Sequence, residues 1–544
     1  MASTLLSLSN AGPALAAAVT SRHESVRRSA ASLQDLLSQV GPKIQLDRTS
    51  SEPNELGTTC ALINLSQTLK TRTKEPGERA LLDQIQRDLA AWLPQHFTEH
   101  PGDRVPFSDF IQSASAGSFP WQEARPPAQA LALLYNFSPF QDTGATVASK
   151  RLRDFNMTFD VVACSFLHKK KQDSTIERIA EPYVSSKYFL PLPASWASWE
   201  PFKAFAVRAS RVAGEMHAMS NYKMVYSRAM WAPSIYAGFL FKQAHPEVEW
   251  VAEFSDPLSL DVEGLPRGAV VPSDSTSAQM IDSVTQSYPD LNNLEFTVFS
   301  LAEYLAYTFA DRIIFTNSNQ KLTMLNHLES ESLRARVERV GEVSNHPTLP
   351  RCYYGMEDPN FVPDPQKLNL GYFGEFYSSR SIREVTSAIR TLPDRLSEKV
   401  HLHVFTNYIP TSEGNRRPRN FSKRQYDELV KRAYDGVGAQ GIEDRVTFNA
   451  SLPYLKFLAT TDTLDYLIVN DAVSGEHHSI NPYLPSKWSD YAGSRAHTWA
   501  FVEQGSILSS KPATVKTPVG DAHQARSTLW DLVLGKFPEL AKEV

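Results

Sequence analysis

Two short segments in the C-terminal part of the chain carry residues suited to binding a phosphate-bearing ligand. In the first, GYFGEFYSSRSIREV (371–385), we expect a strand to end at Gly374 and a helix to begin near Ser381. The free N–H groups and dipole of a helix start favour an anion, and the guanidinium of Arg380 can hold a phosphate through several donors. A tight strand-to-helix turn with a solvated arginine accounts for the same residues.

The second segment, NPYLPSKWSDYAGSRAHTWAFVEQGS (481–506), places a cation and a carboxylate one helical turn apart. Ser486 ends a loop, Lys487 opens a short helix, and Asp490 follows three residues later. Lysine suits phosphate charge and a carboxylate can accept from two ribose hydroxyls, so the pair suits a nucleoside diphosphate. Ser486 as N-cap and Asp490 in the first turn are also favoured by local helix physics, and both interpretations can hold together.

The first series of elements that must position such a site begins at Ala130. Apolar runs alternate there with helical patterns, as is typical of a parallel α/β sheet. Strands are expected at 130–137, 159–166, 222–227, 248–255 and 311–317, and helices within 138–155 and at 233–243 and 301–310. This pattern predicts a Rossmann-like half.

A second series begins at Leu368, after a proline-containing link at 345–359. Strands are expected at 368–373, 399–406, 445–449, 464–470 and 497–503, and helices at 381–392, 422–437, 452–461 and 486–493. Two such halves leave a cleft where the carboxyl ends of their strands face each other, and ligands are expected in it.

The N-terminal region differs from both halves. Within 80–93 the apolar residues have helical spacing, and they are Leu81, Leu82, Ile85, Leu89 and Trp92. We therefore predict an α-helical N-terminal extension over 1–125, with a polar linker at 45–59 and a boundary at 117–127. No catalytic group is recognised there.

The predicted organisation has four parts. The extension (1–125) is followed by a first Rossmann-like domain (126–345) and a second Rossmann-like domain (346–510). The last part (511–544) contains a helix at 527–537, which we expect to return toward the first domain.

Composition excludes several classes of protein. In 544 residues, Lys plus Arg total 55 and Asp plus Glu total 60, so the net charge of −5 disfavours a nucleic-acid partner. Cys60, Cys164 and Cys352 have neither disulfide nor zinc spacing, which fits a reducing cytoplasm. The first basic residue is Arg22, after an uncharged start unlike a secretory signal, and no window approaches 18 apolar residues. Membrane contact is expected to be peripheral at most.

Several segments together resemble one enzyme family. LPSKWSDYAGS (484–494) resembles the "PSKxxEY" signature of retaining glycosyltransferases of the GT-B fold, family 4. GYFGEFYSSRS (371–381) is similar to their donor loop, and 445–471 to the run that follows it. ADRIIFTNSNQ (310–320) and VEWVAEFSDPL (248–258) resemble parts of their acceptor domain, so that the similarity covers about residues 130–510 in order.

The resemblance implies that 126–345 is the acceptor-side domain and 346–510 the nucleotide-sugar donor domain, and it implies roles for individual residues. Gly374, Arg380 and Lys487 would contact the donor diphosphate, beside Ser486, and Asp490 stands where a Glu usually binds the ribose.

The resemblance also implies roles for two residues of the acceptor-side domain. Gly144 would let the acceptor domain approach the diphosphate, although an ordinary helix-entry turn also explains it. Asp256 would orient the acceptor or cap the following loop.

The sequence departs from the family at four places. Pro482 replaces an acidic residue, whose carboxylate Glu476 could supply. Arg228 stands near the usual place of a His, and Glu375 with Phe376 where many relatives have Arg.

The resemblance implies retaining transfer of a sugar from a nucleotide-sugar donor, most plausibly UDP-linked, to a hydroxyl acceptor. The setting it implies is synthesis of a cell-surface polysaccharide or glycoconjugate at the cytoplasmic membrane face, with a glycan or lipid-linked glycan as acceptor. No cofactor and no metal are expected. Arg380 and Lys487 would stabilise charge on the departing diphosphate. The alternatives are a non-catalytic nucleotide-sugar-binding scaffold and a nucleotide-sugar epimerase of the same fold.

Other features have two interpretations each. His477 and His478 suit a metal or, more simply, a polar surface. The basic stretches Lys169–Lys171 and 414–424 are typical of a solvated face or of a surface that attracts anionic lipid. Trp196 and Trp199 suit a membrane-facing edge or packing against neighbouring helices.

Overall fold

The computed structural model describes residues 11–40, 55–114, 119–376, 380–406, 422–475 and 477–542. The chain divides into two compact units. The first comprises Met1–Gln129, Leu152–Asp160 and Arg178–Ser186, and the second comprises Ala130–Arg151, Val161–Glu177 and Lys187–Val544.

The described part of the first unit up to Gln129 is helical, as expected. Its helices are α2 (Ala11–Ala18), α3 (Glu24–Val40), α4 (Glu55–Arg72), α5 (Pro76–Ala90), α6 (Leu93–Glu99), α7 (Arg104–Ala114) and α8 (Trp121–Ala124). Leu82, Ile85 and Leu89 of α5 are buried in one apolar core, whereas Leu81 is 42% exposed. Helix α4 begins inside the expected 45–59 linker, and residues 45–54 lie outside the described ranges.

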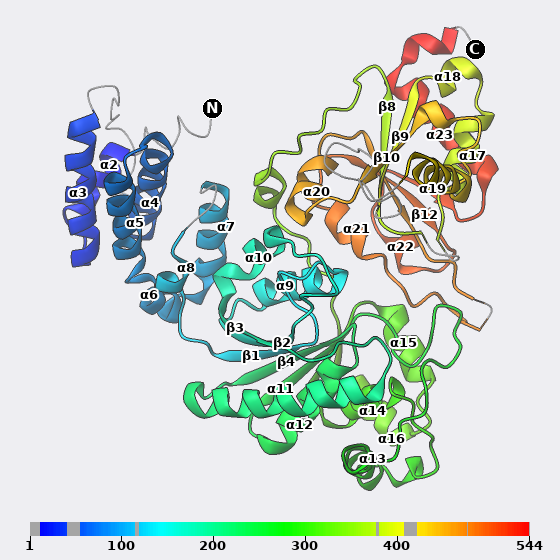
Figure 1. The fold of residues 1–544 in the computed structure, drawn as a ribbon, viewed down its shortest axis with the longest axis horizontal. Coiled ribbons are helices and arrows are strands. Elements are labelled where there is room, and N and C mark those ends of the chain that lie inside the picture. The colour runs from blue at the N-terminus through cyan, green and yellow to red at the C-terminus, as the bar shows by residue number, and fades with distance from the viewer. Residues whose placement is uncertain are drawn as a thin grey trace. The chain divides into compact units, whose positions relative to one another are not determined.

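The first sheet corresponds to the Rossmann-like half expected from Ala130 onward and is drawn in cyan and green in Figure 1. Its strands are β1 (Ala130–Leu134), β2 (Phe159–Cys164), β3 (Val184–Leu190), β4 (Met224–Ala229), β5 (Glu249–Phe254), β6 (Arg312–Phe315) and β7 (Gly341–Val343). They are ordered β3-β2-β1-β4-β5-β6-β7. The pairs β1 with β4, β4 with β5, β5 with β6 and β6 with β7 are parallel.

Helices connect these strands as a parallel sheet requires. They are α9 (Thr143–Phe155), α10 (Ser174–Ala180), α11 (Trp199–Ser220), α12 (Pro233–Ala244), α13 (Ser275–Ser287), α14 (Ser300–Phe309), α15 (Ser318–Asn326) and α16 (Glu331–Val340). The sequence patterns predicted α9, α12 and α14 but not the 22-residue α11.

The second sheet is parallel throughout. Its strands are β8 (Leu368–Phe373), β9 (Val400–Thr406), β10 (Val446–Ala450), β11 (Tyr466–Asn470), β12 (His497–Val502) and β13 (Val515–Pro518), ordered β10-β9-β8-β11-β12-β13. Its helices are α17 (Arg383–Thr391), α18 (Asp394–Ser397), α19 (Lys423–Gly436), α20 (Tyr454–Thr461), α21 (Ser486–Tyr491), α22 (Ile507–Ser510) and α23 (Ala522–Lys536). Every residue of β8 is buried, as a continuous apolar run in a parallel sheet predicts.

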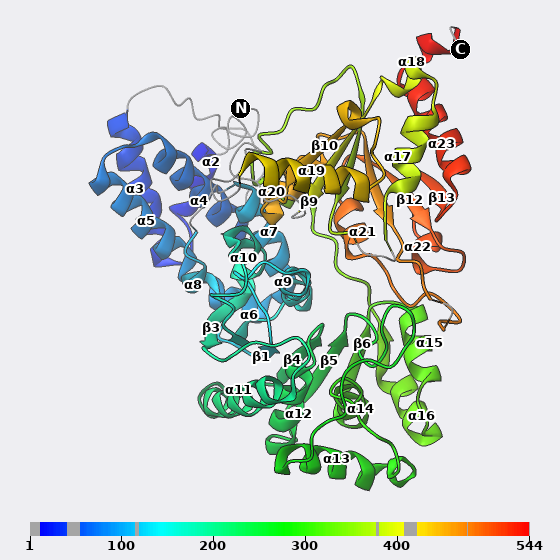
Figure 2. The ribbon, with the colours of Figure 1, turned by 45° about the vertical axis from the view of Figure 1, so that its right-hand side comes forward.

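The C-terminal segment corrects one expectation. Helix α23 does not return to the first domain: Ala525, Leu529 and Val533, spaced four apart on one face, are buried in the core of the second sheet. Figure 2 shows α23 beside α17, with which it is in contact. Strand β13 also extends the second sheet by pairing with β12.

The link between the two sheets is fixed where it leaves β7. Arg151 Nε lies 3.0 Å from Glu253 Oε2, and both side chains are buried. The same guanidinium donates to the carbonyl oxygens of Ser344 (3.1 Å) and Asn345 (3.2 Å). A buried ion pair therefore holds the start of the connection against the first sheet.

No helix in the described ranges is both long and apolar enough to cross a bilayer.

Candidate functional site

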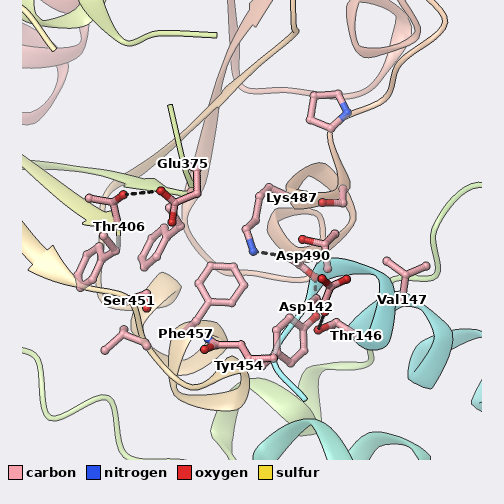
Figure 3. A pocket seen from close by; sticks show the side chains of 18 of the residues that line it. Asp142, Thr146, Val147, Glu375, Thr406, Ser451, Tyr454, Phe457, Lys487 and Asp490 are labelled. Atoms are coloured by element: carbon pink, nitrogen blue, oxygen red, sulfur yellow. Dashed lines mark hydrogen bonds and ion pairs between the residues drawn. The ribbon is translucent and has the colours of Figure 1, made fainter. Parts of the chain in front are cut away.

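A cavity of about 550 Å³ lies in the second unit, lined by residues of both parallel halves (Figure 3). On the side of the second sheet its wall includes Phe373 at the end of β8 and Asn470 at the end of β11. The site therefore lies at the carboxyl ends of these strands, where a doubly wound sheet places its ligands. Its volume is in the range of small-molecule pockets.

Charges of both signs line this cavity. The cationic side chains are those of Lys150, Lys170, Arg380 and Lys487, and the acidic ones are those of Asp142, Asp173, Glu375 and Asp490. Which of the cations are already engaged by protein carboxylates decides where an anionic ligand can bind.

Lys487, the second residue of α21, presents its amine to the cavity. Its side chain keeps 33% of its surface accessible, and its Nζ lies 3.8 Å from Asp490 Oδ2. The Nζ is also 4.3 Å from the centroid of the Phe457 ring. Burial lowers the pKa of Lys487. The charge of Lys150 lowers this pKa further, whereas the carboxylate of Asp490 partly opposes the shift. Its long contact with Asp490 leaves the ammonium available to a ligand.

Asp490 is more fully engaged than its predicted ribose-binding role requires. Its Oδ1 lies 2.5 Å from Lys150 Nζ and accepts a hydrogen bond of 2.5 Å from the Tyr454 hydroxyl. Burial by itself would raise the pKa of Asp490, but the cations Lys150 and Lys487 outweigh it and hold the pKa below its usual value. In this conformation the carboxylate joins the two halves.

Arg380 lines the cavity just before α17 and is half-buried. Its buried Nε has no hydrogen-bond partner within the described ranges. The segment after it is anchored by Asn470, whose Nδ2 donates to the carbonyl oxygen of Ser381 at 2.6 Å. The helix itself begins at Arg383, slightly later than the sequence predicts. An unsatisfied guanidinium N–H beside a cavity is a donor that a ligand oxygen can satisfy.

Gly374 follows β8 and also lines the cavity. Its φ of +148° is strained for any residue with a Cβ, and its N–H donates to the carbonyl oxygen of Phe405 at 3.1 Å. The structure thus brings Gly374, Arg380, Ser486, Lys487 and Asp490 to one cavity.

Gly144 and Asp256 lie outside the lining of this cavity. Gly144 is in the first turn of α9, where its N–H donates to Asp142 Oδ1 (2.7 Å) and an added Cβ would lie 2.7 Å from Met230 Sδ. The glycine is therefore needed for close packing of Met230 against α9.

Asp256 follows β5 and its surface is exposed. Partial removal of its carboxylate from water raises its pKa, and this rise is opposed by the positive charges of Arg228, Arg380 and Arg267. Its carboxylate does not cap the loop after it. Glu303 does so by accepting from Leu258 N (2.6 Å) and Ser259 N (2.9 Å).

A second contact between the halves involves the start of α20. Asp173 Oδ2 accepts from Tyr454 N at 2.7 Å, and Thr175 Oγ1 accepts from Leu455 N at 3.1 Å. Side chains from the first sheet's connections thereby satisfy two free N–H groups of a helix on the second sheet.

Lys150, Asp173 and Tyr454 could not be recognised as site residues from sequence patterns. Lys150 lies within an expected helix, and nothing in the SKRLRDF pattern distinguishes it from the basic residues beside it. Lys170 was seen only as part of a basic run, yet it lines the cavity and pairs with Asp142.

The tryptophans of the 192–202 segment separate into two environments. Trp199 is buried in α11 and donates to Asp274 Oδ2 at 2.6 Å, so it packs against neighbouring elements. Trp196 is 41% exposed and lines the cavity. Of the basic stretch 414–424, residues 414–421 lie outside the described ranges.

The residues that depart from the family pattern lie in different surroundings. Arg228 is buried beside Glu253 (Nε to Oε1, 3.4 Å) and His346 (NH2 to Nε2, 3.3 Å), away from the cavity lining. Glu375 lines the cavity and accepts a hydrogen bond of 3.4 Å from Thr406 Oγ1. Pro482 accepts through its carbonyl oxygen from Asn317 Nδ2, and Glu476 is outside the described ranges.

A group of possible metal ligands among the described residues lies at the ends of α11 and α12: His217, His245 and Glu247. The backbone N–H of Tyr222 donates to His217 Nδ1 at 3.1 Å, so the neutral ring carries its proton on Nε2 and offers no lone pair there. The Nε2 faces Glu247 Oε1 at 3.4 Å, as an N–H donor would. These residues do not fit a metal centre.

The adjacent histidines have unlike environments. His477 is exposed, and His478 is buried with its Nε2 3.1 Å from the carbonyl oxygen of Asp261.

Comparisons with known proteins find no matching family model and no matching curated protein. Among solved structures the chain is similar to a sucrose-phosphate synthase from Thermosynechococcus elongatus (12% identity, 76% of this chain, 99% of that chain, TM-score 0.43). A UDP-forming α,α-trehalose-phosphate synthase from Burkholderia xenovorans, in complex with glucose-6-phosphate, has 8% identity over 74% of this chain and 92% of that one (TM-score 0.44). The UDP-GlcNAc 2-epimerase from Neisseria meningitidis, bound to UDP-GlcNAc, has 9% identity over 75% and 92% (TM-score 0.41).

Proposed function

We propose that this chain is a retaining glycosyltransferase, which moves a sugar from a UDP-linked donor to a hydroxyl acceptor. The sequence support is the ordered set of segments that resembles the family-4 enzymes of the GT-B fold. The observation that carries the proposal is the joint presence of Lys487 and Arg380 in one cavity, each with a donor available to a ligand.

The proposed chemistry requires stabilisation of a departing diphosphate. As the bond between the sugar and the diphosphate breaks, negative charge grows on the bridging oxygen and the phosphate. Fixed cations that meet this charge stabilise the transition state more than the ground state. Lys487 and Arg380 are assigned this role, and Gly374 allows the donor to approach the backbone after β8.

The acceptor hydroxyl would attack from the face that the diphosphate leaves, with the phosphate helping to accept its proton. Ser486 would line the diphosphate site, Gly144 would let the acceptor-side domain approach the diphosphate, and Asp256 would orient the acceptor. Asp490 would bind the ribose hydroxyls, and this requires its carboxylate to exchange part of its contact with Lys150 for the ligand.

Binding of UDP by the purified protein tests the assignment. Each of Arg380→Ala and Lys487→Ala should weaken binding about 10- to 100-fold, because a charge-assisted contact contributes roughly 1.5–3 kcal/mol. Arg432→Ala and Lys516→Ala, at exposed positions outside the cavity, are the matched controls and should bind UDP like the parent. If both cavity variants bind UDP within twofold of the parent, the diphosphate assignment is wrong.

Turnover distinguishes the proposal from its alternatives. Incubation with a panel of UDP-sugars and saccharide acceptors should release UDP in an acceptor-dependent way. A scaffold would bind UDP saturably and consume no sugar, and an epimerase would convert its donor without any acceptor.

A further inference from the structure

An aromatic cluster forms part of the cavity wall on the side of the first sheet. The rings of Phe166 and Trp196 are stacked, with centroids 5.6 Å apart and planes 14° apart. The Trp196 and Trp231 rings are 4.5 Å apart and inclined by 36°. Trp196 and Trp231 line the cavity, and Trp196 is 41% exposed. Two adjacent indole rings on the cavity wall form a contiguous apolar patch, and a patch of this kind suits a ligand.

The charges beside this cluster compensate one another. Lys170 Nζ lies 5.0 Å from the Trp196 centroid and 5.7 Å from that of Trp231, and it forms an ion pair with Asp142. Lys150, farther along the wall, is paired with Asp490. Both lysines of this wall are thus already neutralised, so it offers a phosphate group little beyond what water offers.

Polar side-chain groups next to the rings have no hydrogen-bond partner in the described part of the chain. The Trp231 indole N–H is buried, with no acceptor in the described part of the chain. Gln141 and Thr143 also line the cavity, and within those same ranges no hydrogen bond involves the Gln141 amide or the Thr143 hydroxyl. Donors and acceptors of this kind match the alternating hydroxyls of a sugar.

We propose that Trp196 and Trp231, with the buried Phe166 stacked behind Trp196, bind the acceptor, and that this acceptor is an uncharged saccharide. The weakly positive C–H groups of a pyranose ring pack against the electron-rich faces of aromatic rings, while its hydroxyls meet Gln141 and Thr143. The inference rests on the proposed function and specifies its acceptor. The cluster selects a neutral sugar over a sugar phosphate because the nearby cations are paired.

Saturation-transfer NMR on the full-length chain in the presence of UDP provides the test. The probes are methyl α-glucoside, methyl α-mannoside, methyl β-galactoside, N-acetylglucosamine and glucose 6-phosphate. At least one neutral probe should receive saturation at its C–H protons, more strongly than glucose 6-phosphate. The effect should fall at least fivefold in Trp196→Ala and persist in Trp196→Phe, which keeps an aromatic face.

The matched control is Trp530→Ala, a tryptophan of α23 that packs against the core of the second sheet and is not among the residues that line the cavity. It should retain the parent's transfer. Absence of transfer to every neutral probe, preference for glucose 6-phosphate, or equal transfer in Trp196→Ala overturns the inference.

Binding of UDP to the same samples is recorded separately. A parent that binds UDP but no neutral sugar refutes the acceptor assignment alone. A parent that binds a neutral sugar through Trp196 but no UDP refutes the proposed function and leaves the saccharide site standing.

Discussion

Lys150 of α9 and Asp490 of α21 form a buried ion pair across the two parallel halves of the second unit. The Nζ to Oδ1 distance is 2.5 Å, and the side chains are 2% and 5% exposed although 340 positions separate them in sequence. Lys150 also donates to Ser489 Oγ at 3.2 Å. One lysine therefore secures two consecutive residues of the segment that carries Lys487.

Replacement of this lysine tests how much the pair contributes. Lys150→Met keeps the apolar stem but leaves Asp490 buried with only Lys487, at 3.8 Å, as a cation. We expect the free energy of unfolding, measured by urea denaturation, to fall by about 2–4 kcal/mol. In Lys150→Met/Asp490→Asn the loss should be smaller than the sum of the two single losses, because no charge is stranded.

The control for that series is Arg432→Met, which removes one member of an exposed pair with Glu428. Its effect should stay below about 0.5 kcal/mol. Strictly additive losses in the double variant would show that Lys150 and Asp490 do not stabilise each other.

Asp173 tests the second contact between the halves. Its Oδ2 accepts a hydrogen bond from Tyr454 N at the start of α20. Asp173→Ala should therefore lower the free energy of unfolding by about 1 kcal/mol. It should also accelerate amide hydrogen exchange at Tyr454 and Leu455. Ser422→Ala removes the N-cap of α19 within a single half and should accelerate exchange only at the start of α19. Unchanged exchange at Tyr454 in Asp173→Ala would refute the role of this cap.

Asp471 predicts a pH dependence of stability. Burial raises its pKa from 3.8 to about 6, while its Oδ2 accepts from Ser506 Oγ and Glu503 N. The folded chain holds this proton more tightly than the unfolded chain, so its stabilising effect is complete below about pH 4 and is lost as the pH rises through 6.

Asp471→Asn keeps one oxygen acceptor and removes the charge. The variant should be more stable than the parent by about 1–3 kcal/mol at pH 8 and nearly equal to it at pH 4, measured by urea denaturation at both pH values. Asp531→Asn, at an exposed position, should leave the pH profile of the parent unchanged. A gain for Asp471→Asn that is the same at both pH values would exclude titration of Asp471 as its cause.

Removal of divalent metal tests whether the protein's own cations suffice. Because Arg380 and Lys487 are assigned to the diphosphate, UDP affinity in EDTA should match that in Mg²⁺ or Mn²⁺ within twofold. Calorimetric titration in the three buffers measures it. A loss of tenfold or more in EDTA would mean that a metal ion supplies charge that the two side chains do not.

The two parallel sheets were predictable because buried parallel strands appear in the sequence as short, continuous apolar runs separated by helical patterns. Strand β8 agrees with its expected bounds at 368–373. Strand β3 was missed because only its two end residues are buried and its middle residues are exposed or half-buried, so its sequence contains no continuous apolar run. The place of α23 was wrong because an amphipathic helix reveals its apolar face but not the sheet that covers it.

The candidate site was predictable where local motifs define it. Gly374, Ser486 and Lys487 line one cavity because each follows a strand whose carboxyl end opens there. The contacts of Lys150, Asp173 and Tyr454 could not be foreseen, since each depends on a partner in the opposite half. Long-range ion pairs leave no periodic trace in a single sequence.

The anchored start of the link between the sheets restricts how the halves can separate. Arg151 and Glu253 fix Ser344 and Asn345, and His346 is buried with its Nε2 3.3 Å from Arg228. Any hinge for admitting a bulky substrate must therefore lie beyond His346. The prolines that follow His346 have a fixed φ and therefore limit the backbone rotations available there. Domain opening would then be a rotation about a short, stiff hinge.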